Sequence, residues 1–277
     1  MGSKHLNLIF PQWQGGGQDL STYHGAKEFY ELYLKNSKVK EIEVSMDEVI
    51  DTTNDIFGYD ILIEQMARAQ DLIKDEAPDT IFTIGGGCDA NIPMVSYLNH
   101  KVSSNLTVLW FDSHGDLNTP KSSHSKYFYG MPLRTLLGDG DDYMVESLSS
   151  TLNPSQVVMM GARDLDPEEQ SYIQEHAIPV VTISDMEHHA EDVIQLIRSK
   201  GSKNLYLHID LDVLDCEEFP YVPVPMKGGL TRNTLSTLIS LLQNEFHIIG
   251  IDIMEYNQTG MKPYEMFNVI TKIGLEL

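Results

Sequence analysis

Short runs of apolar and β-branched residues recur along this chain and alternate with amphipathic stretches. Each apolar run has the length of a buried strand rather than of a helix. The expected strands are Leu6–Phe10, Glu41–Val44, Thr80–Ile84, Thr107–Phe111, Val157–Gly161, Pro179–Ile183, Leu205–Ile209 and Ile248–Ile253. The expected helices are His24–Leu34, Tyr59–Lys74, Asn91–Leu98, Pro167–Glu175, Asp185–Ser199 and Thr231–Asn244. Apolar strands that alternate with helices indicate a parallel sheet covered on both faces. We therefore predict a three-layer α/β/α fold with a central, mostly parallel sheet of about eight strands.

The domain organisation follows from length and composition. The 277 residues contain no Gly/Ser linker, Pro-rich hinge or low-complexity tract at which the chain would divide. α/β folds often reach this length as one unit. We predict a single domain over residues 1–277.

The charge of the chain is strongly negative, with 41 acidic residues against 19 basic ones and a net charge of −22. Nucleic-acid binding depends on Lys and Arg, so this balance argues against a nucleic-acid partner. An acidic protein attracts cations, either metal ions or positively charged small molecules, although the same charge also serves solubility.

The length of the apolar runs also indicates where in the cell the protein is expected. Runs such as Val102–Phe111 are far shorter than the roughly 20 residues of a membrane span. The opening segment, MGSKHLNLIF, lacks the apolar stretch and cleavage site of a signal peptide. Two cysteines, Cys88 and Cys216, are too few for a disulfide framework, which fits a reducing compartment. We expect a cytoplasmic protein with no membrane partner.

Acidic and His residues follow several expected strands directly. Ligands of open α/β sheets bind beyond the carboxyl ends of the strands. Asp112, His114 and Asp116 alternate after one strand, and alternate residues of an extended chain face the same side. Asp210 and Asp212 repeat the spacing after another strand. Four carboxylates and one imidazole suit Mn²⁺, and Asp112 and Asp210 are placed to bridge two ions.

Several segments resemble the arginase and agmatinase (ureohydrolase) family, in the order that the family has them. The resemblance lies in FDSHGDLNTP (111–120) against D-A-H-x-D-x-N, GARDLDPEE (161–169) against G-x-R-D-x-D-P, HIDLDVLD (208–215) against S-x-D-x-D-x-x-D, KGGLT (227–231) against G-G-L-T, and GIDIMEYN (250–257) against a last-strand motif ending in Glu. A looser match joins IGGGCDAN (84–91) to G-G-D-H-S. The resemblance implies an arginase-like fold and a manganese-dependent hydrolase of C–N bonds.

The resemblance also assigns roles to single residues. It implies manganese ligation by Asp112, His114, Asp116, Asp210 and Asp212. Asn118 and Ser125 would contact the far end of the substrate, Asp164 would support the site, and Asp166 would meet a substrate amino group. The two catalytic residues would be Asp116, which takes a proton from water, and Glu255, which binds a guanidinium through charge-assisted hydrogen bonds. A capping turn before Pro167 is the alternative role of Asp164 and Asp166.

Three positions depart from the family pattern. Cys88 stands where the family has a His ligand. As a thiolate it would bind a metal and favour zinc or iron over manganese, and as a neutral thiol it would leave one site weak. The chain would accordingly hold two Mn²⁺ if Cys88 coordinates, and otherwise one firmly bound ion.

The other two departures lie at the substrate pocket. Tyr129 replaces a His that shuttles protons, and tyrosine, with an ordinary pKa near 10, is a poor shuttle at neutral pH. Residues 222–225 read ValProValPro in place of T-G-T-P, which removes a hydroxyl. His124 either compensates for the lost His or is a solvated loop residue. Cys216 is expected to be a packed core or loop thiol.

The expected partner is a small cationic guanidino or amidine substrate, and the choice among arginine, agmatine, guanidinobutyrate and formiminoglutamate stays open. Two rival functions remain: a binding or regulatory protein that has lost catalysis, and an amide deacylase on the same fold. The retained Glu255 and the pair Asp210 and Asp212 favour the ureohydrolase. The resemblance is also compatible with a homo-oligomer.

Overall fold

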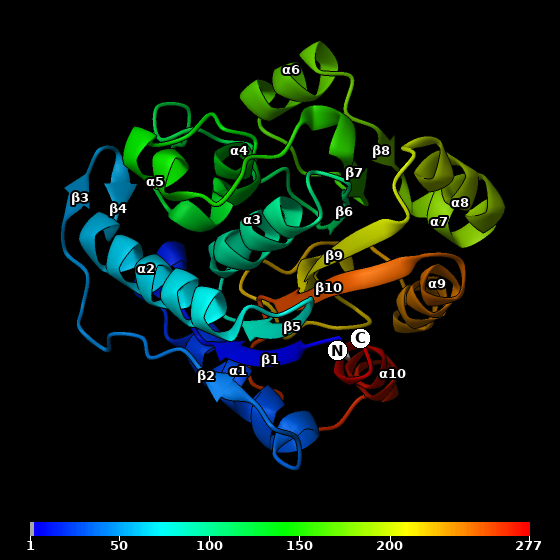
Figure 1. The fold of residues 1–277 in the computed structure, drawn as a ribbon, viewed down its shortest axis with the longest axis horizontal. Helices are drawn as coiled ribbons and strands as arrows, with labels where there is room; N and C mark the ends of the chain where they lie inside the picture. Colours follow the sequence, from blue (N-terminus) through cyan, green and yellow to red (C-terminus); the bar gives the residue numbers. More distant parts are fainter. Residues whose placement is uncertain (1–2) are drawn as a thin grey trace.

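A central sheet of eight parallel strands organises the computed structural model, which describes residues 3–277 (Figure 1). The strands are β1 (His5–Phe10), β2 (Lys40–Glu41), β5 (Thr80–Gly85), β6 (Thr107–Phe111), β7 (Val157–Met160), β8 (Val180–Val181), β9 (Asn204–Asp210) and β10 (His247–Met254). Their order across the sheet is β2-β1-β5-β10-β9-β6-β7-β8, and every neighbouring pair is parallel. The predicted fold class is confirmed.

Helices cover both faces of the sheet, because successive strand residues point to opposite sides. In β6, Val108 and Trp110 join one apolar core, while Leu109 and Phe111 join the other. The first core packs against α2 (Tyr59–Glu76), α3 (Ile92–Lys101), α4 (Pro132–Leu136), α5 (Asp142–Ser147) and α6 (Pro167–Glu175). The second packs against α1 (Ser21–Phe29), α7 (Ile183–His188), α8 (Ala190–Ser199), α9 (Arg232–Glu245) and α10 (Glu265–Leu275).

Some expected elements were wrong in extent. The strand expected at Glu41–Val44 is reduced to the short edge strand β2, and the one expected at Pro179–Ile183 is reduced to β8. The helix expected at Asp185–Ser199 is two helices, with a break at His189 (φ −132°, ψ 38°). The first of the two helices is capped by Thr182, whose side chain accepts a hydrogen bond from the Asp185 N–H. Met186 of α7 and Val193 of α8 both lie in the core.

Other elements were not expected at all. The helices α4, α5 and α10 are absent from the sequence prediction, as is a small antiparallel hairpin of β3 (Thr52–Thr53) and β4 (Ile56–Phe57). The helix expected at His24–Leu34 is α1 followed by a π-helical turn at Tyr30–Leu34.

The fold places four strand ends side by side. Strands β5, β10, β9 and β6 are consecutive neighbours in the middle of the sheet and run parallel. Their carboxyl ends therefore meet at one edge. The residues that follow them are separated widely along the chain, and the sheet brings them to one place.

Candidate metal centre

Each of the four central strands is followed by, or ends in, at least one polar residue at this edge. Asp112 comes directly after β6, Asp210 is the last residue of β9, and Glu255 comes directly after β10. Cys88 begins the 3-10 turn η3 (Cys88–Asn91) that follows β5. All four side chains are buried. The site is thus assembled from segments that only the sheet order makes neighbours.

One group of possible metal ligands consists of Asp112, His114 and Asp212, whose ligand atoms all lie within 4.8 Å of one another. His114 Nδ1 lies 2.8 Å from Asp212 Oδ2 and 3.5 Å from Asp112 Oδ1. Backbone N–H groups hold the carboxylates in place: His114 donates to Asp112 (2.7 Å) and Ser113 donates to Asp212 (2.9 Å). Two carboxylates and an imidazole fit a hard divalent cation such as Mn²⁺.

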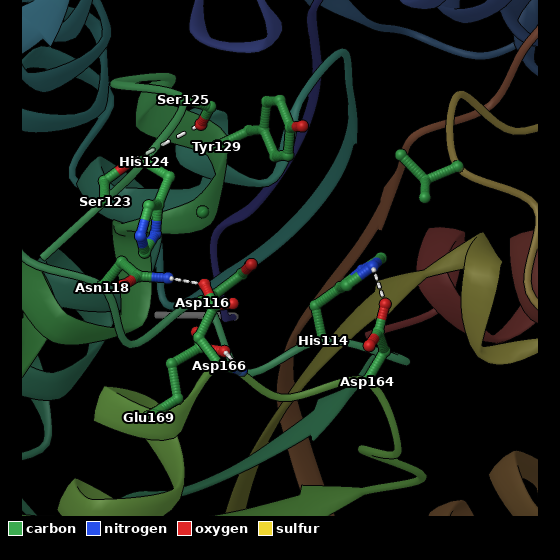
Figure 2. Close-up of a pocket in the computed structure, with 12 residues that line it drawn as sticks. His114, Asp116, Asn118, Ser123, His124, Ser125, Tyr129, Asp164, Asp166 and Glu169 are labelled. Atoms are coloured by element: carbon green, nitrogen blue, oxygen red, sulfur yellow. Dashed lines mark hydrogen bonds and ion pairs between the residues drawn. The ribbon is translucent and has the colours of Figure 1, made fainter.

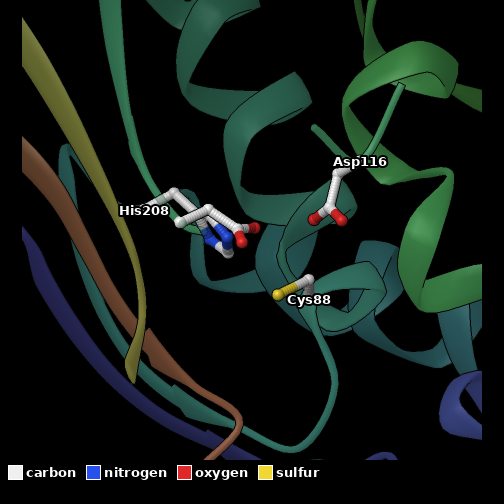
Figure 3. Close-up of side chains that lie close together, drawn as sticks. Cys88, Asp116 and His208 are labelled. Carbon is white, nitrogen blue, oxygen red and sulfur yellow. The ribbon is translucent and has the colours of Figure 1, made fainter. Parts of the chain in front are cut away.

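Two further groups share the thiol of Cys88. One contains Cys88, Asp112, Asp116 and His208, and the other contains Cys88, Asp210 and Glu255. Figure 3 shows the thiol, the Asp116 carboxylate and the His208 ring around a common space. The Cys88 thiol lies 3.0 Å from Asp210 Oδ2, and the Cys88 N–H donates to Glu255 Oε1 at 3.3 Å. Asp112 belongs to two of the groups, and its bridging role stays a prediction.

These side chains do not converge because they alternate along extended strands, so that sequence prediction was wrong. The strand β6 ends at Phe111, and Asp116 has a left-handed backbone (φ 53°). Asp212 lies in the 3-10 turn Leu211–Val213 rather than in extended chain. Glu255 is also left-handed (φ 61°). Non-glycine residues in this conformation are strained and gather at functional sites, where surrounding structure holds them.

The cluster concentrates negative charge away from water. Burial, followed by the nearby carboxylates, raises the pKa values of Asp116, Asp210 and Glu255 well above the ordinary range. Burial would also raise the pKa of Asp112, but the hydrogen bond from His114 and its charge outweigh burial and lower it. The pKa of His114 is raised, because its bonds to Asp112 and Asp212 outweigh burial.

The residues present fit a divalent cation. Asp116 Oδ2 is buried and has no hydrogen-bond partner among residues 3–277. Several buried carboxylates held within reach of one point are costly unless a cation pairs with them. Oxygen, nitrogen and sulfur donors are all available, so the set can take either a hard or a softer ion.

A pocket of about 320 Å³ opens beside the cluster (Figure 2). Its lining contains His114, Asp116, Asn118, Ser123, His124, Ser125, Tyr129, Gly130, Asp164, Asp166, Glu169 and Val224. The Asn118 amide donates to Asp166 Oδ2 at 2.9 Å, and Asp164 lies 3.7 Å from His114 Nε2 with its side chain 59% exposed. All the residues expected to contact substrate other than Glu255 therefore line this pocket, and their roles stay predictions.

Asp166 has the capping position that the sequence left open, and its contact with a substrate stays a prediction. It is the N-cap residue of α6, and its N–H donates to Glu169 Oε2 at 3.0 Å. Its carboxylate nevertheless lines the pocket.

Tyr129 lies on the 3-10 turn Phe128–Gly130 at the pocket wall. Burial, followed by the charge of Glu255, raises the pKa of Tyr129 to about 12. Tyr129 therefore keeps its proton at neutral pH and can form hydrogen bonds there without exchanging that proton. His124 is exposed and lines the same pocket.

Four buried acidic or imidazole side chains near the site were missed by the sequence reasoning: Asp89, Glu169, His208 and Asp252. Glu169 accepts hydrogen bonds from the N–H groups of Leu117 (2.9 Å) and Asp166. His208 and Asp252 lie directly opposite each other on β9 and β10. A signal existed for this pair, because each interrupts an apolar strand two or three residues before a proposed site residue.

The fold and the site define a class of α/β proteins in which the central parallel strands end in a buried cluster of acids. The arginase family model matches residues 20–264, and the chain belongs to the arginase family, a family of hydrolases. It is 30% identical over 226 residues to an arginase of Staphylococcus aureus (strain MRSA252), which covers 79% of this chain and 74% of that one.

The chain is also similar to a second relative, and it shares its fold with a solved structure. The arginase of Bacillus subtilis (strain 168) is 32% identical over 160 residues, 55% of this chain and 53% of the relative. The structure of Entamoeba histolytica arginase in complex with L-ornithine aligns with a TM-score of 0.85 at 22% identity and covers 99% of both chains. In the part of the chain that the structure describes, no helix combines the length and apolarity needed to cross a membrane.

Proposed function

We propose that this protein is a metal-dependent hydrolase that cleaves a C–N bond of a small, cationic guanidino or amidine compound. The observation that carries the proposal is the placement of Glu255, a buried carboxylate directly after β10 that shares a ligand group with Cys88 and Asp210. A carboxylate beside a metal centre can hold a planar cation by paired, charge-assisted hydrogen bonds. Membership in the arginase family supports the same reading.

The metal would be held first by Asp112, His114 and Asp212, for which Mn²⁺ is the proposed ion. When bound there it would lower the pKa of a water molecule enough to supply hydroxide near neutral pH. A second ion would use Cys88, with zinc or iron as the alternatives to manganese.

The protein residues would then orient the substrate and move its protons. Glu255 would fix the guanidinium or amidinium carbon in front of the attacking oxygen. Asp116, whose pKa burial raises, would accept the proton that the attacking water loses and would return it to the leaving nitrogen as the C–N bond breaks. Asn118 and Asp166, held together at 2.9 Å, would bind the far end of the substrate. Tyr129 would donate a hydrogen bond at the wall without exchanging its proton.

The test is a substrate panel with purified protein and Mn²⁺. Arginine, agmatine, guanidinobutyrate and formiminoglutamate would be assayed for urea, ammonia or formamide, with an acetylated amine to detect deacylation. We expect hydrolysis of at least one guanidino or formimino compound, loss of activity in EDTA, and recovery with added metal. Asp112→Asn should be inactive, whereas Asp60→Asn, which alters an exposed acid on α2, should match the wild type.

Other results of this assay would indicate a different function. Turnover of the acetylated amine alone would make the protein a deacylase. Metal binding without turnover of any compound would contradict the hydrolase and favour a binding or regulatory protein.

A further inference from the structure

His208 lies on β9, deeper in the sheet than the residues at the strand ends that form the metal centre. It precedes Asp210 by two residues on β9, so both side chains project from the same face of the strand. Its ring is wholly buried and stacks on Trp110 of β6, with the ring centroids 3.8 Å apart. Trp110 in turn donates from Nε1 to Asp112 Oδ2 at 3.2 Å. The imidazole is therefore fixed in direction by the strands on either side of it.

The partner of one ring nitrogen sets the tautomer. His208 Nδ1 lies 2.7 Å from Oδ1 of Asp252, a buried carboxylate opposite it on β10. An imidazole that donates from Nδ1 to this carboxylate keeps Nε2 available as a ligand atom. The Asn91 Nδ2 atom also lies 2.8 Å from Nδ1, and Asn91 Oδ1 has no partner in the described chain. In the reverse orientation of this amide, Oδ1 accepts from the same N–H.

The other ring nitrogen has no partner in the described part of the chain. His208 Nε2 is buried and has no hydrogen-bond partner within residues 3–277. The imidazole offers one ligand atom within 4.8 Å of ligand atoms from Cys88, Asp112 and Asp116 (Figure 3). Asp116 contributes a second orphaned atom, Oδ2, to the same space. Two buried acceptors without donors, beside a thiol and another carboxylate, are arranged to face a cation.

A purely structural role does not explain this arrangement. A core histidine that leaves a buried ring nitrogen without a hydrogen-bond partner destabilises the fold. By contrast, a metal-binding histidine ordinarily donates its second ring N–H to a carboxylate, which fixes the ring and increases its basicity. Here Asp252 is the carboxylate, His208 is the histidine beside it, and the ligand atoms of Cys88, Asp112 and Asp116 lie where the metal would be bound.

We propose that His208 is a metal ligand, and that it forms with Cys88, Asp112 and Asp116 a thiolate–imidazole–carboxylate site that prefers zinc, cobalt or ferrous ions to manganese. Zinc sites in proteins are built from these donor types, whereas thiolate gives little advantage to manganese. Asp252 is the positioning residue of this site. The inference rests on the metal centre of the proposed function, but it does not depend on the substrate.

The experiment is a titration of metal-free, full-length protein with Co²⁺, followed by absorption spectroscopy. The wild type should show a sulfur-to-cobalt charge-transfer band in the near ultraviolet. Cys88→Ser should lose this band. His208→Asn keeps a donor toward Asp252 but removes the ligand nitrogen, so it should retain the band, change the visible cobalt bands and weaken zinc binding at least tenfold. Asp252→Asn should weaken zinc binding by roughly tenfold.

Two further variants control for folding and for metal preference. His247→Asn alters an exposed imidazole on β10 and should bind zinc as the wild type does. Cys88→His should shift the preference from zinc toward manganese. Thermal unfolding of each variant is measured with EDTA and with zinc. A merely structural role of His208 would lower both midpoints equally, whereas a ligand role removes the increase that zinc produces.

The outcomes separate this inference from the proposed function. A wild type that lacks the charge-transfer band, or a His208→Asn variant that folds and binds zinc with unchanged affinity, overturns the inference even if manganese supports hydrolysis. A wild type with the band and the His208 effect, but without turnover of any guanidino or formimino compound, leaves this site standing and contradicts the hydrolase.

Discussion

Glu255 shows how a single residue at this site is constrained. Its backbone is left-handed (φ 61°), its carboxylate is buried, and its N–H donates to the carbonyl of Gly86 at 2.8 Å. The strained conformation costs about 1–3 kcal/mol and turns the side chain from the line of β10 toward Cys88. Burial, with the charges of Asp212 and Asp89, keeps the pKa of Glu255 high, so a cationic partner is needed to stabilise the ionised form.

Replacing Glu255 with Gln should therefore separate binding from folding. Gln preserves shape but loses the ionic part of the contact with a guanidinium, so turnover should fall at least a hundredfold while metal content stays the same. The measurements are steady-state kinetics and elemental analysis, with Glu43→Gln, an exposed acid, as the matched control. A fully active Gln variant would show that another group holds the substrate or that the substrate is not a cation.

The loop from β5 to η3 illustrates positioning by an element. It is clamped on one side by β1, because Gly86 donates to the Phe10 carbonyl (3.1 Å) and Gly87 donates to the Gln12 carbonyl (2.9 Å). A Cβ on Gly86 would lie only 1.7 Å from the Gln12 oxygen. Glycine is thus required at position 86, because the two backbones approach so closely. This contact sets where Cys88 enters the metal centre.

Gly86→Ala should displace this loop and with it the Cys88 thiol. We expect a loss of stability of about 2–4 kcal/mol and a clear fall in zinc affinity, measured by urea unfolding and by metal titration. Gly130→Ala is the control, because a Cβ there would meet no atom within 4 Å. If the Gly86 variant unfolds and binds zinc as the control does, the loop does not depend on its approach to β1.

At the scale of the whole molecule, the buried acids link stability to pH. Burial raises the pKa of Asp89 to about 7 from an ordinary 3.8, and that of Glu169 to about 7 from 4.5. A group whose pKa is higher in the folded state stabilises the fold fully below its unfolded pKa and loses that contribution as pH rises through its folded pKa. Groups with lowered pKa values, such as Glu28 and Asp112, act at lower pH.

Metal-free protein should therefore lose stability between about pH 4.5 and pH 7, with Glu169 alone accounting for roughly 3 kcal/mol. Urea unfolding in EDTA at several pH values measures this. Glu169→Gln should flatten the slope, whereas Glu168→Gln, its exposed neighbour, should not. Added zinc should oppose the loss, because deprotonated ligands bind it more tightly. Metal-free stability that is constant or rises over this range would contradict the prediction.

The sequence by itself determined the layers of this protein and pointed to most of the residues that the sheet gathers in the candidate metal centre. Apolar strands such as Thr107–Phe111 are buried on both faces, so they carry a strong local signal that does not depend on distant partners. Asp112, Asp210 and Glu255 stand out for the same reason: each is a charged residue at the end of such a strand. Short edge elements such as β2 and β8, with two residues each, carry too little local pattern to be delimited.

Tertiary structure alone decided which of these residues meet. The order β5-β10-β9-β6 sets residues from four distant segments side by side, and strand order is not encoded in the periodicity of any one strand. The same holds for His208: only its register opposite Asp252 and its stacking on Trp110 turn an apparently ordinary strand residue into a proposed ligand. The hydrophobic pattern of a segment indicates which of its residues are buried and which are exposed to water. The geometry of a site depends instead on contacts between segments far apart in the chain.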